Sequence, residues 1–270
     1  MRHEVVRTRG GALAMRSLEA GEVMHPGVGP VAEAQALYVS QSRLGERLRA
    51  HAAEELVLFD AGLGAGSNAL AAWAESERAP AEAARLCLVS FERDLGALEL
   101  ALAAGAPFGL EDEAAVAARA LLDGGAHDTA RTRWRLRHGE LLENLALARL
   151  GTLRADIVFW DPFSPRANPS LWTVAAFAAL RRAAGPRCTL ATYSAATATR
   201  VALLLAGWAV GVGDAIGDKA QTTAAAVDAG DLARPLDRPW LGRLSRPDAR
   251  LPADAPPDAA ARLAQLPQFA

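Results

Sequence analysis

Apolar and polar residues alternate along the chain as short apolar runs and longer amphipathic segments. Apolar runs of four to eight residues bounded by turn residues are typical of strands buried on both faces of a parallel sheet, and the amphipathic segments are typical of helices. The pattern predicts strands over 56–60, 86–92, 134–138, 155–161, 188–193, 208–214 and 221–227, and helices over 67–77, 95–104, 112–122, 140–149, 170–183 and 196–206. This alternation predicts an α/β fold with a helix-covered sheet, whose ligands bind at the carboxyl ends of the strands.

Two flanking regions differ from this alternating part. Residues 4 to about 24 alternate around "RGG" and "EAGE", which predicts an antiparallel β-hairpin, and the segment that follows has helical periodicity. We therefore divide the chain into a hairpin and helix over 1–50, a Rossmann-like domain over 51–227 and a tail over 228–270. The tail is rich in Pro, Asp and Arg, which favours an irregular segment with Trp240 and Leu241 anchored on the domain.

The charge and composition of the sequence limit which kinds of partner the protein can have. The formal net charge of −2 over 270 residues gives no overall attraction to nucleic acid, so an RNA-binding surface would have to be a local patch. The sequence has no signal-peptide core and no apolar run of membrane-spanning length, so we expect a cytoplasmic protein with no membrane partner. Cys87 and Cys188 lie in apolar runs and are expected to be buried free thiols.

Histidine spacing argues against a metal site. None of the five histidines pairs with Cys, Asp or Glu at ligand spacing, so we predict no metal. His25 precedes the helix that could roof a ligand pocket. A role in that pocket and a role in loop packing are both open for it.

The stretch "ELVLFDAGLGAGSNALAAW" carries the first candidate site. A strand ending at Asp60 is followed at once by Gly62, Gly64 and Gly66, and then by an Ala-rich helix that Ser67 or Asn68 could cap. Glycine lets the backbone approach a ligand closely, and the first turn of the helix presents unpaired N–H groups. The combination predicts the start of a nucleotide-binding unit.

Acidic residues end or follow four predicted strands: Asp60, Glu92, Glu140 and Asp161. A dinucleotide pyrophosphate favours positive potential, whereas S-adenosylmethionine carries a sulfonium cation and no phosphate. Four acids around one rim therefore favour the cationic cofactor, with Glu92 accepting hydrogen bonds from the ribose and Glu140 near the adenine. Capping of the next helix is the alternative at each position.

The segment "FWDPFSPRANPSLW" carries the candidate reaction site. Asp161, Pro162 and Phe163 resemble the Asn/Asp-Pro-Pro-aromatic loop of amino-group methyltransferases. In that loop the acidic or amide oxygen and the proline carbonyl accept hydrogen bonds from the target nitrogen, so that its lone pair points at the methyl group. A proline-rich loop without a catalytic role is the alternative.

At these residues the chain resembles the methyltransferase domain of the MnmC family of tRNA 5-methylaminomethyl-2-thiouridine biosynthesis enzymes. The similarity runs from about residue 10 to 227, and "DPFSPRANPSLWT" followed by "LATYSAATATR" is its most specific part. It implies a class I methyltransferase fold, with a seven-stranded sheet whose last strand is antiparallel, and S-adenosyl-L-methionine as cofactor. It also implies methylation of the 5-aminomethyl group of a tRNA wobble uridine. The candidate cofactor-binding residues are Asp60, Gly62, Gly64, Gly66, Asn68, Glu92, Glu140 and Asp161, and the candidate catalytic residues are Asp161, Pro162 and Phe163.

No flavin-binding sequence follows the methyltransferase part, so we expect a free-standing form without the oxidative activity of the bifunctional enzyme. The candidate substrate-binding residues are Phe163, Arg166, Arg200 and Lys219. Two further interpretations stay open, namely a methyltransferase of a small-molecule amine and a non-catalytic module that binds S-adenosylmethionine or RNA. The oligomeric state is not predicted.

A row of arginines is a further candidate for RNA contact. Arg131, Arg133, Arg135 and Arg137 alternate through "ARTRWRLRHG", which puts them on one face of a predicted strand. Contact with RNA phosphate and a solvated sheet edge are both open for them.

Overall fold

The computed structural model describes residues 3–8, 10–25, 29–50, 55–215, 220–247 and 249–270. Within these residues an eight-stranded sheet has the order β10-β11-β9-β8-β4-β5-β7-β6. Its parallel strands are β4 (Glu55–Ala61), β5 (Arg85–Glu92), β7 (Thr132–His138), β8 (Ala155–Trp160) and β9 (Ala184–Thr192). The last strand, β11 (Thr222–Ala226), runs antiparallel to β9 and to β10 (Ala209–Gly213).

The sheet has one strand more than the seven expected. All seven expected strands are present, and the additional one is β6 (Ala126–Asp128), which pairs antiparallel with β7 at the edge. Because β6 has three residues, it is too short to produce an alternating pattern in the sequence.

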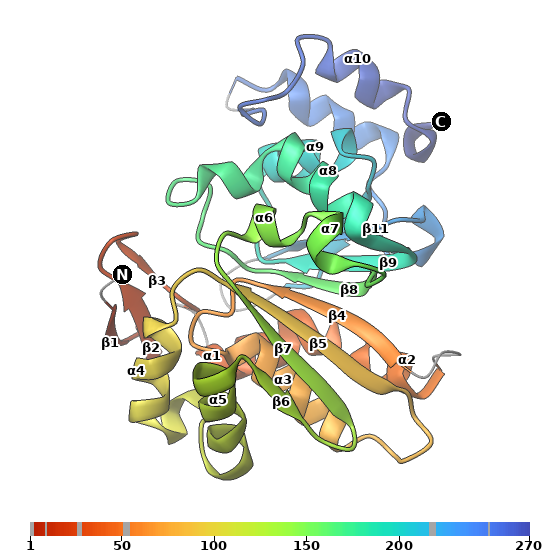
Figure 1. Cartoon of the computed structure of the whole chain (residues 1–270). Coiled ribbons are helices and arrows are strands. Elements are labelled where there is room, and N and C mark those ends of the chain that lie inside the picture. The colour runs from red at the N-terminus through yellow and green to blue at the C-terminus, as the bar shows by residue number, and fades with distance from the viewer. Residues whose placement is uncertain (1–2, 9, 26–28, 51–54, 216–219, 248) are drawn as a thin grey trace.

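Helices cover both faces of the sheet (Figure 1). On one face lie α3 (Ser67–Glu77), α4 (Gly96–Ala104), the 3-10 turn η2 (Ala106–Phe108) and α5 (Asp112–Gly124). On the other lie α6 (Leu141–Asn144), α7 (Leu147–Leu150), α8 (Val174–Ala183) and α9 (Thr197–Leu205). The sheet side chains alternate between the two layers, as Leu58 and Phe59 of β4 do.

Three expected helices are interrupted. The helix expected over 140–149 is split into α6 and α7, and that expected over 170–183 begins as a 3-10 turn, η3 (Pro169–Trp172), before Thr173 caps α8. The helical segment before β4 consists of α1 (Pro30–Glu33), a π-helical stretch η1 (Ala34–Ser40) and α2 (Leu44–Ala50). A positive φ of 55° at Arg43 separates the last two.

The N-terminal region forms a small sheet of its own. It contains β1 (His3–Arg7), β2 (Leu13–Ser17) and the two-residue β3 (Glu22–Val23), so the expected hairpin has a third strand. This sheet lies beside α4, at the edge where the parallel strands end (Figure 1). The N-terminal residues are thereby brought to the predicted ligand-binding edge.

The C-terminal region is more ordered than the expected irregular tail. Residues 228–270 contain η4 (Ala229–Asp231), η5 (Arg238–Ser245), α10 (Ala259–Ala264) and η6 (Pro267–Phe269). Of these, η5, α10 and η6 lie over α8 and α9 (Figure 1), whereas Asp231 of η4 pairs with Arg187 of β9. Trp240, Leu263 and Phe269 are buried in the core of that layer, and Leu241 packs against it. These apolar residues are spaced too widely to give a periodic signal in the sequence.

Cys87 and Cys188 are buried free thiols, as expected. No helix within the described ranges is both long and apolar enough to cross a membrane.

Candidate active site

A cavity of about 510 Å³ opens at the carboxyl ends of the parallel strands. The turn after β4, the ends of β5 and β7, the loop after β8 and the N-terminal segment around β3 form its walls. Of the candidate residues, those that line it are Gly62, Gly64, Glu92, Glu140, Asp161, Pro162 and Phe163. The structure therefore brings the glycine turn and the Asp-Pro-Phe loop to one cavity.

The glycine turn is shaped by close approaches that a side chain would block. Gly62 and Gly64 have positive φ values of 93° and 54°. A Cβ atom at Gly62 would lie 2.8 Å from the carbonyl oxygen of Asp161, and one at Gly64 would lie 3.1 Å from the Met24 sulfur. Gly66, at φ 89°, precedes the first residue of α3 and does not line the cavity. The turn can therefore lie against both the Asp161 loop and the N-terminal segment.

Glu92 connects the end of β5 to this turn. Its Oε2 accepts a hydrogen bond from the Gly64 amide at 2.9 Å, and its Oε1 accepts bonds from the amides of Arg93 at 2.7 Å and Asp94 at 2.9 Å. Glu140, which follows β7, is exposed in the same part of the cavity, and its Oε1 lies 3.4 Å from Nη1 of Arg93. Two carboxylates thus face the half of the cavity nearest β5 and β7.

Asp60 does not lie on the rim where the sequence placed it. Its side chain is fully buried, and its Oδ2 accepts a 2.8 Å bond from Ser90, whose oxygen accepts in turn from the indole of Trp134. Burial raises the pKa of Asp60 to about 7. Because Asp60 is one residue inside β4, its side chain points into the helix layer rather than past the strand end. The prediction of Asp60 as a cofactor ligand is corrected accordingly.

Asp161 lies at the centre of a polar cluster. Its Oδ2 accepts a 2.6 Å bond from Nδ2 of Asn68 and lies 3.6 Å from Nε2 of His25. Burial raises the pKa of Asp161, and the neighbouring His25 and Asn68 act in the opposite direction. Asn68 was expected to contact the cofactor, but it is buried off the cavity wall and holds this carboxylate.

The rest of the loop is fixed through its backbone. The Pro162 carbonyl accepts a 3.2 Å bond from the hydroxyl of Tyr193, and the Phe163 carbonyl accepts a 2.8 Å bond from the indole of Trp172. A carbonyl oxygen has two lone pairs, so the Pro162 carbonyl keeps one for a ligand. Phe163 itself lines the cavity.

A glutamate that sequence reasoning missed holds the loop from the other side. Glu22 of β3 accepts a 3.0 Å hydrogen bond from the Ser164 amide and a second hydrogen bond from the Ser164 hydroxyl. It also forms a 3.2 Å ion pair with Arg166. In the sequence this residue was part of a turn signal. Glu22 reaches Ser164 only because the small N-terminal sheet packs against the loop after β8.

The structure places the four candidate substrate-binding residues in different surroundings. Phe163 lines the cavity, and the Arg166 side chain is 73% exposed beside it. Arg200 is 1% exposed, so the prediction that it contacts phosphate is wrong. Its guanidinium donates to Thr223 Oγ1 at 3.0 Å and to the Thr222 carbonyl at 2.9 Å, and burial lowers its pKa to about 10. It faces inward on α9 and joins that helix to β11. Lys219 lies outside the described residues.

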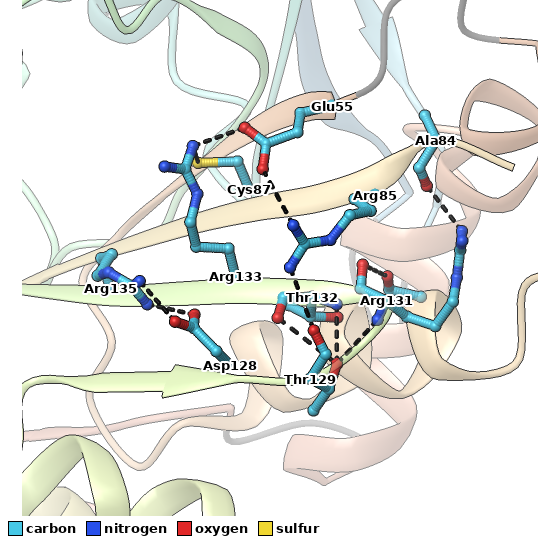
Figure 2. A network of polar contacts seen from close by, with 11 residues as sticks. Glu55, Ala84, Arg85, Cys87, Asp128, Thr129, Arg131, Thr132, Arg133 and Arg135 are labelled. Atoms are coloured by element: carbon cyan, nitrogen blue, oxygen red, sulfur yellow. Dashed lines mark hydrogen bonds and ion pairs between the residues drawn. The ribbon is translucent and has the colours of Figure 1, made fainter.

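The row of arginines on and before β7 is largely held by neighbours within the chain (Figure 2). Arg133 forms a 2.6 Å ion pair with Glu55, and Arg135 donates to Asp128 at 2.7 Å. Arg131 donates to the carbonyl of Ala84 at 2.8 Å. These contacts favour a structural role at the sheet edge for the three residues. No cluster of three or more His, Cys, Asp or Glu side chains suited to a metal occurs in the part of the chain that the structure describes.

Comparison with known proteins gives consistent matches. A family model described as S-adenosyl-L-methionine-dependent methyltransferase matches residues 124–228. The tRNA 5-methylaminomethyl-2-thiouridine biosynthesis bifunctional protein MnmC of Methylibium petroleiphilum is 32% identical over 228 residues, which are 82% of this chain and 34% of that protein. The protein of the same name from Ectopseudomonas mendocina is 34% identical over 237 residues, with 83% and 34% covered. The chain thus spans about a third of the length of the curated relatives it matches.

A solved structure supports the fold. The crystal structure of MnmC2 from Aquifex aeolicus superposes with a TM-score of 0.65 at 23% identity, covering 84% of this chain and 70% of that one. At this level of identity the match concerns the fold.

Proposed function

The chain belongs to the S-adenosyl-L-methionine-dependent methyltransferase family that its MnmC-named relatives represent, and from that premise we propose that it methylates the 5-aminomethyl group of a tRNA wobble uridine. The observation that carries this proposal is that Asp161, Pro162 and Phe163 line one cavity together with the carboxylates of Glu92 and Glu140. The relatives' name supplies the substrate class. Because tRNA is a cytoplasmic substrate, the proposal also implies a cytoplasmic protein.

The acidic lining of the cavity suits a positively charged cofactor. Gly62 and Gly64 let the turn approach the Asp161 loop and Met24 closely, and five acidic side chains line the walls, which suits a cation without phosphate groups. They are those of Glu22, Glu33, Glu92, Glu140 and Asp161. S-adenosylmethionine supplies an electrophilic methyl group on a positively charged sulfur. In this proposal Glu92 accepts the ribose hydroxyls and Glu140 accepts from the adenine.

The residues of the loop prepare the amine for attack. An alkylamine is largely protonated in neutral water and then has no lone pair. We assign to Asp161 the acceptance of a proton from the ammonium group, and to the Pro162 carbonyl a hydrogen bond from a remaining N–H that orients the nitrogen. Phe163 offers a ring on which an extruded base can stack.

A small-molecule amine is the second candidate substrate. Arg200 is buried, and Arg131, Arg133 and Arg135 make contacts within the chain, which weakens the case for these four as phosphate ligands. Arg166 remains exposed beside the cavity. A non-catalytic module is disfavoured because the loop residues face the cavity together.

The test is incubation of the protein with tRNA from cells lacking this modification and with methyl-labelled cofactor, followed by mass spectrometry of the nucleosides. Label on a 5-aminomethyluridine supports the tRNA proposal, and fully modified tRNA serves as control. Label in a small-molecule extract and none in RNA supports the second candidate. Label in neither contradicts both.

A further inference from the structure

An imidazole lies beside Asp161 that the proposed function has not used. Nε2 of His25 is 3.6 Å from Asp161 Oδ2, and Nδ1 of the same ring is 3.7 Å from Glu33 Oε1. The side chains of His25, Glu33 and Asp161 are 11%, 10% and 14% exposed. Carboxylate, imidazole and carboxylate therefore form a row that begins at the proposed amine site and continues along the cavity wall to α1.

The backbone of His25 has an unusual conformation. Its φ is 52°, in the left-handed region that residues with a Cβ atom rarely adopt. Such conformations cost free energy, and they concentrate at functional sites where the surroundings hold them. Here the ring that results lines the cavity between two acids.

Acidic side chains lie on both sides of the ring. Glu33 from α1, Asp161 from the loop after β8 and the buried Asp60 from β4 are the acidic groups facing it, and Tyr38 of η1 and Tyr193 after β9 adjoin Asp161. Negative groups within a few ångströms raise the proton affinity of an imidazole. A neutral His25 in this place can therefore receive a proton, and Glu33 can stabilise the cation that results.

We propose that His25, supported by Glu33, receives through Asp161 the proton that the substrate ammonium group loses before methyl transfer. This inference rests on the proposed amine methylation. It assigns a proton acceptor that neither the sequence motif nor the family match contains.

The step balances as follows. An N–H bond of the ammonium group breaks as an O–H bond forms on Asp161, and that proton passes to Nε2 of His25. The amine lone pair then forms the bond to the methyl carbon as the carbon–sulfur bond breaks. The methylated ammonium product leaves, and His25 releases its proton to water. The 3.6 Å separation before substrate binds is compatible with this, since catalytic hydrogen bonds often shorten in the substrate complex.

The experiment compares wild type with His25→Asn, because asparagine tolerates the left-handed conformation and lacks the imidazole. The measurement is the single-turnover rate of methyl transfer from pH 6 to 10 at saturating cofactor, using whichever amine substrate the labelling experiment identifies. We expect His25→Asn to be slower at pH 7 by about tenfold or more. The deficit should shrink toward pH 10 as the free amine becomes abundant. Binding of S-adenosylhomocysteine should be unchanged.

Glu33→Gln should change the pH profile of the methyl-transfer rate in a way that a mere packing role of Glu33 would not. Removing the carboxylate lowers the proton affinity of His25, so the rise of the rate with pH should move to lower pH and reach a lower plateau. His127→Gln, at β6 and outside the cavity lining, is the matched control with a wild-type profile. If His25→Asn keeps the wild-type rate and pH profile, the inference is wrong while the proposed function stands. If wild type itself methylates neither tRNA nor a small amine, the proposed function fails and the inference with it.

Discussion

At the scale of the residue, the surroundings of two aspartates at neighbouring strand ends decide what each can do. Asp60 is one residue inside β4, accepts a bond from Ser90 and lies outside the cavity lining. Asp161 follows the last residue of β8 and lines the cavity. Side chains alternate between the two faces along a strand, so a single residue of shift moves a carboxylate from the rim into the core.

The pH dependence of stability should reveal the buried Asp60. Its pKa is about 7 in the folded protein and 3.8 without burial, so between these values folding takes up a proton. Raising the pH through this window therefore lowers the free energy of unfolding, by at most about 1.4 kcal/mol per unit. Asp60→Asn removes this dependence, and its stability relative to wild type should increase from pH 5 to pH 8 in urea titrations. The exposed Asp123→Asn is the control, and parallel curves for wild type and Asp60→Asn would refute the assignment.

Arg200 shows a second limit of reading single residues. Its charge and its position after "LATYSA" indicate a surface contact. In the structure, however, Arg200 and its neighbours Thr199 and Val201 are all buried on α9. A long side chain can bury its apolar stem while its guanidinium donates hydrogen bonds to the backbone carbonyls of a neighbouring strand. The sequence does not reveal which polar groups β11 offers.

At the scale of the element, the loop over 161–164 is held from three directions. Glu22 of β3 binds Ser164, Asn68 of α3 binds Asp161, and Trp172 of η3 binds the carbonyl of Phe163. Orientation of a reacting group depends on such support, since small displacements reduce rates strongly. The N-terminal sheet is therefore part of the cavity wall.

Removal of the Glu22 carboxylate should loosen the loop. We expect Glu22→Ala to slow single-turnover methyl transfer by about tenfold or more while the affinity for S-adenosylhomocysteine changes little, because the glycine turn and Glu92 remain. Glu19→Ala, at an exposed position of the turn between β2 and β3, is the matched control. An unchanged rate in Glu22→Ala would show that the contact with Ser164 does not position the loop.

The elements of the main sheet were predictable and several of the others were not. Buried strands such as β4 and β5 are continuous apolar runs, so composition and length suffice to find them. The strands β3 and β6 have two and three residues and depend on their partners for their pairing. The break between η1 and α2 depends on the left-handed Arg43, for which the sequence gives no signal.

At the scale of the whole molecule, the charge balance gives no overall attraction to RNA. The net charge is −2, and Arg133, Arg135 and Arg200 are engaged within the chain. Arg166 is 73% exposed and forms an ion pair with Glu22, which lines the cavity. Recognition of tRNA by this protein would therefore rest on few phosphate contacts and have a shallow dependence on salt.

Arg166→Ala and Arg200→Ala should separate binding from stability. We expect Arg166→Ala to weaken tRNA binding and to reduce the slope of log K against log salt by about 0.7 to 0.9, the value for one phosphate contact. Arg200→Ala should lower the thermal midpoint and leave the slope of the folded protein unchanged. Arg262→Ala, on α10 and 61% exposed, is the control. Equal slopes for wild type and Arg166→Ala would remove Arg166 from the RNA contact.

The central claim is that Asp161 lies beside the amine and prepares it for methyl transfer. Single-turnover transfer from labelled cofactor to undermodified tRNA tests it most directly, with wild type, Asp161→Asn and Asp161→Ala compared at saturating concentrations. We predict that Asp161→Ala keeps its fold and much of its cofactor affinity but reacts about a hundredfold more slowly or worse, since orientation and proton acceptance are both lost. Asp161→Asn should fall between, because an amide still accepts a hydrogen bond but takes no proton. Transfer by Asp161→Ala at close to the wild-type rate would contradict the account.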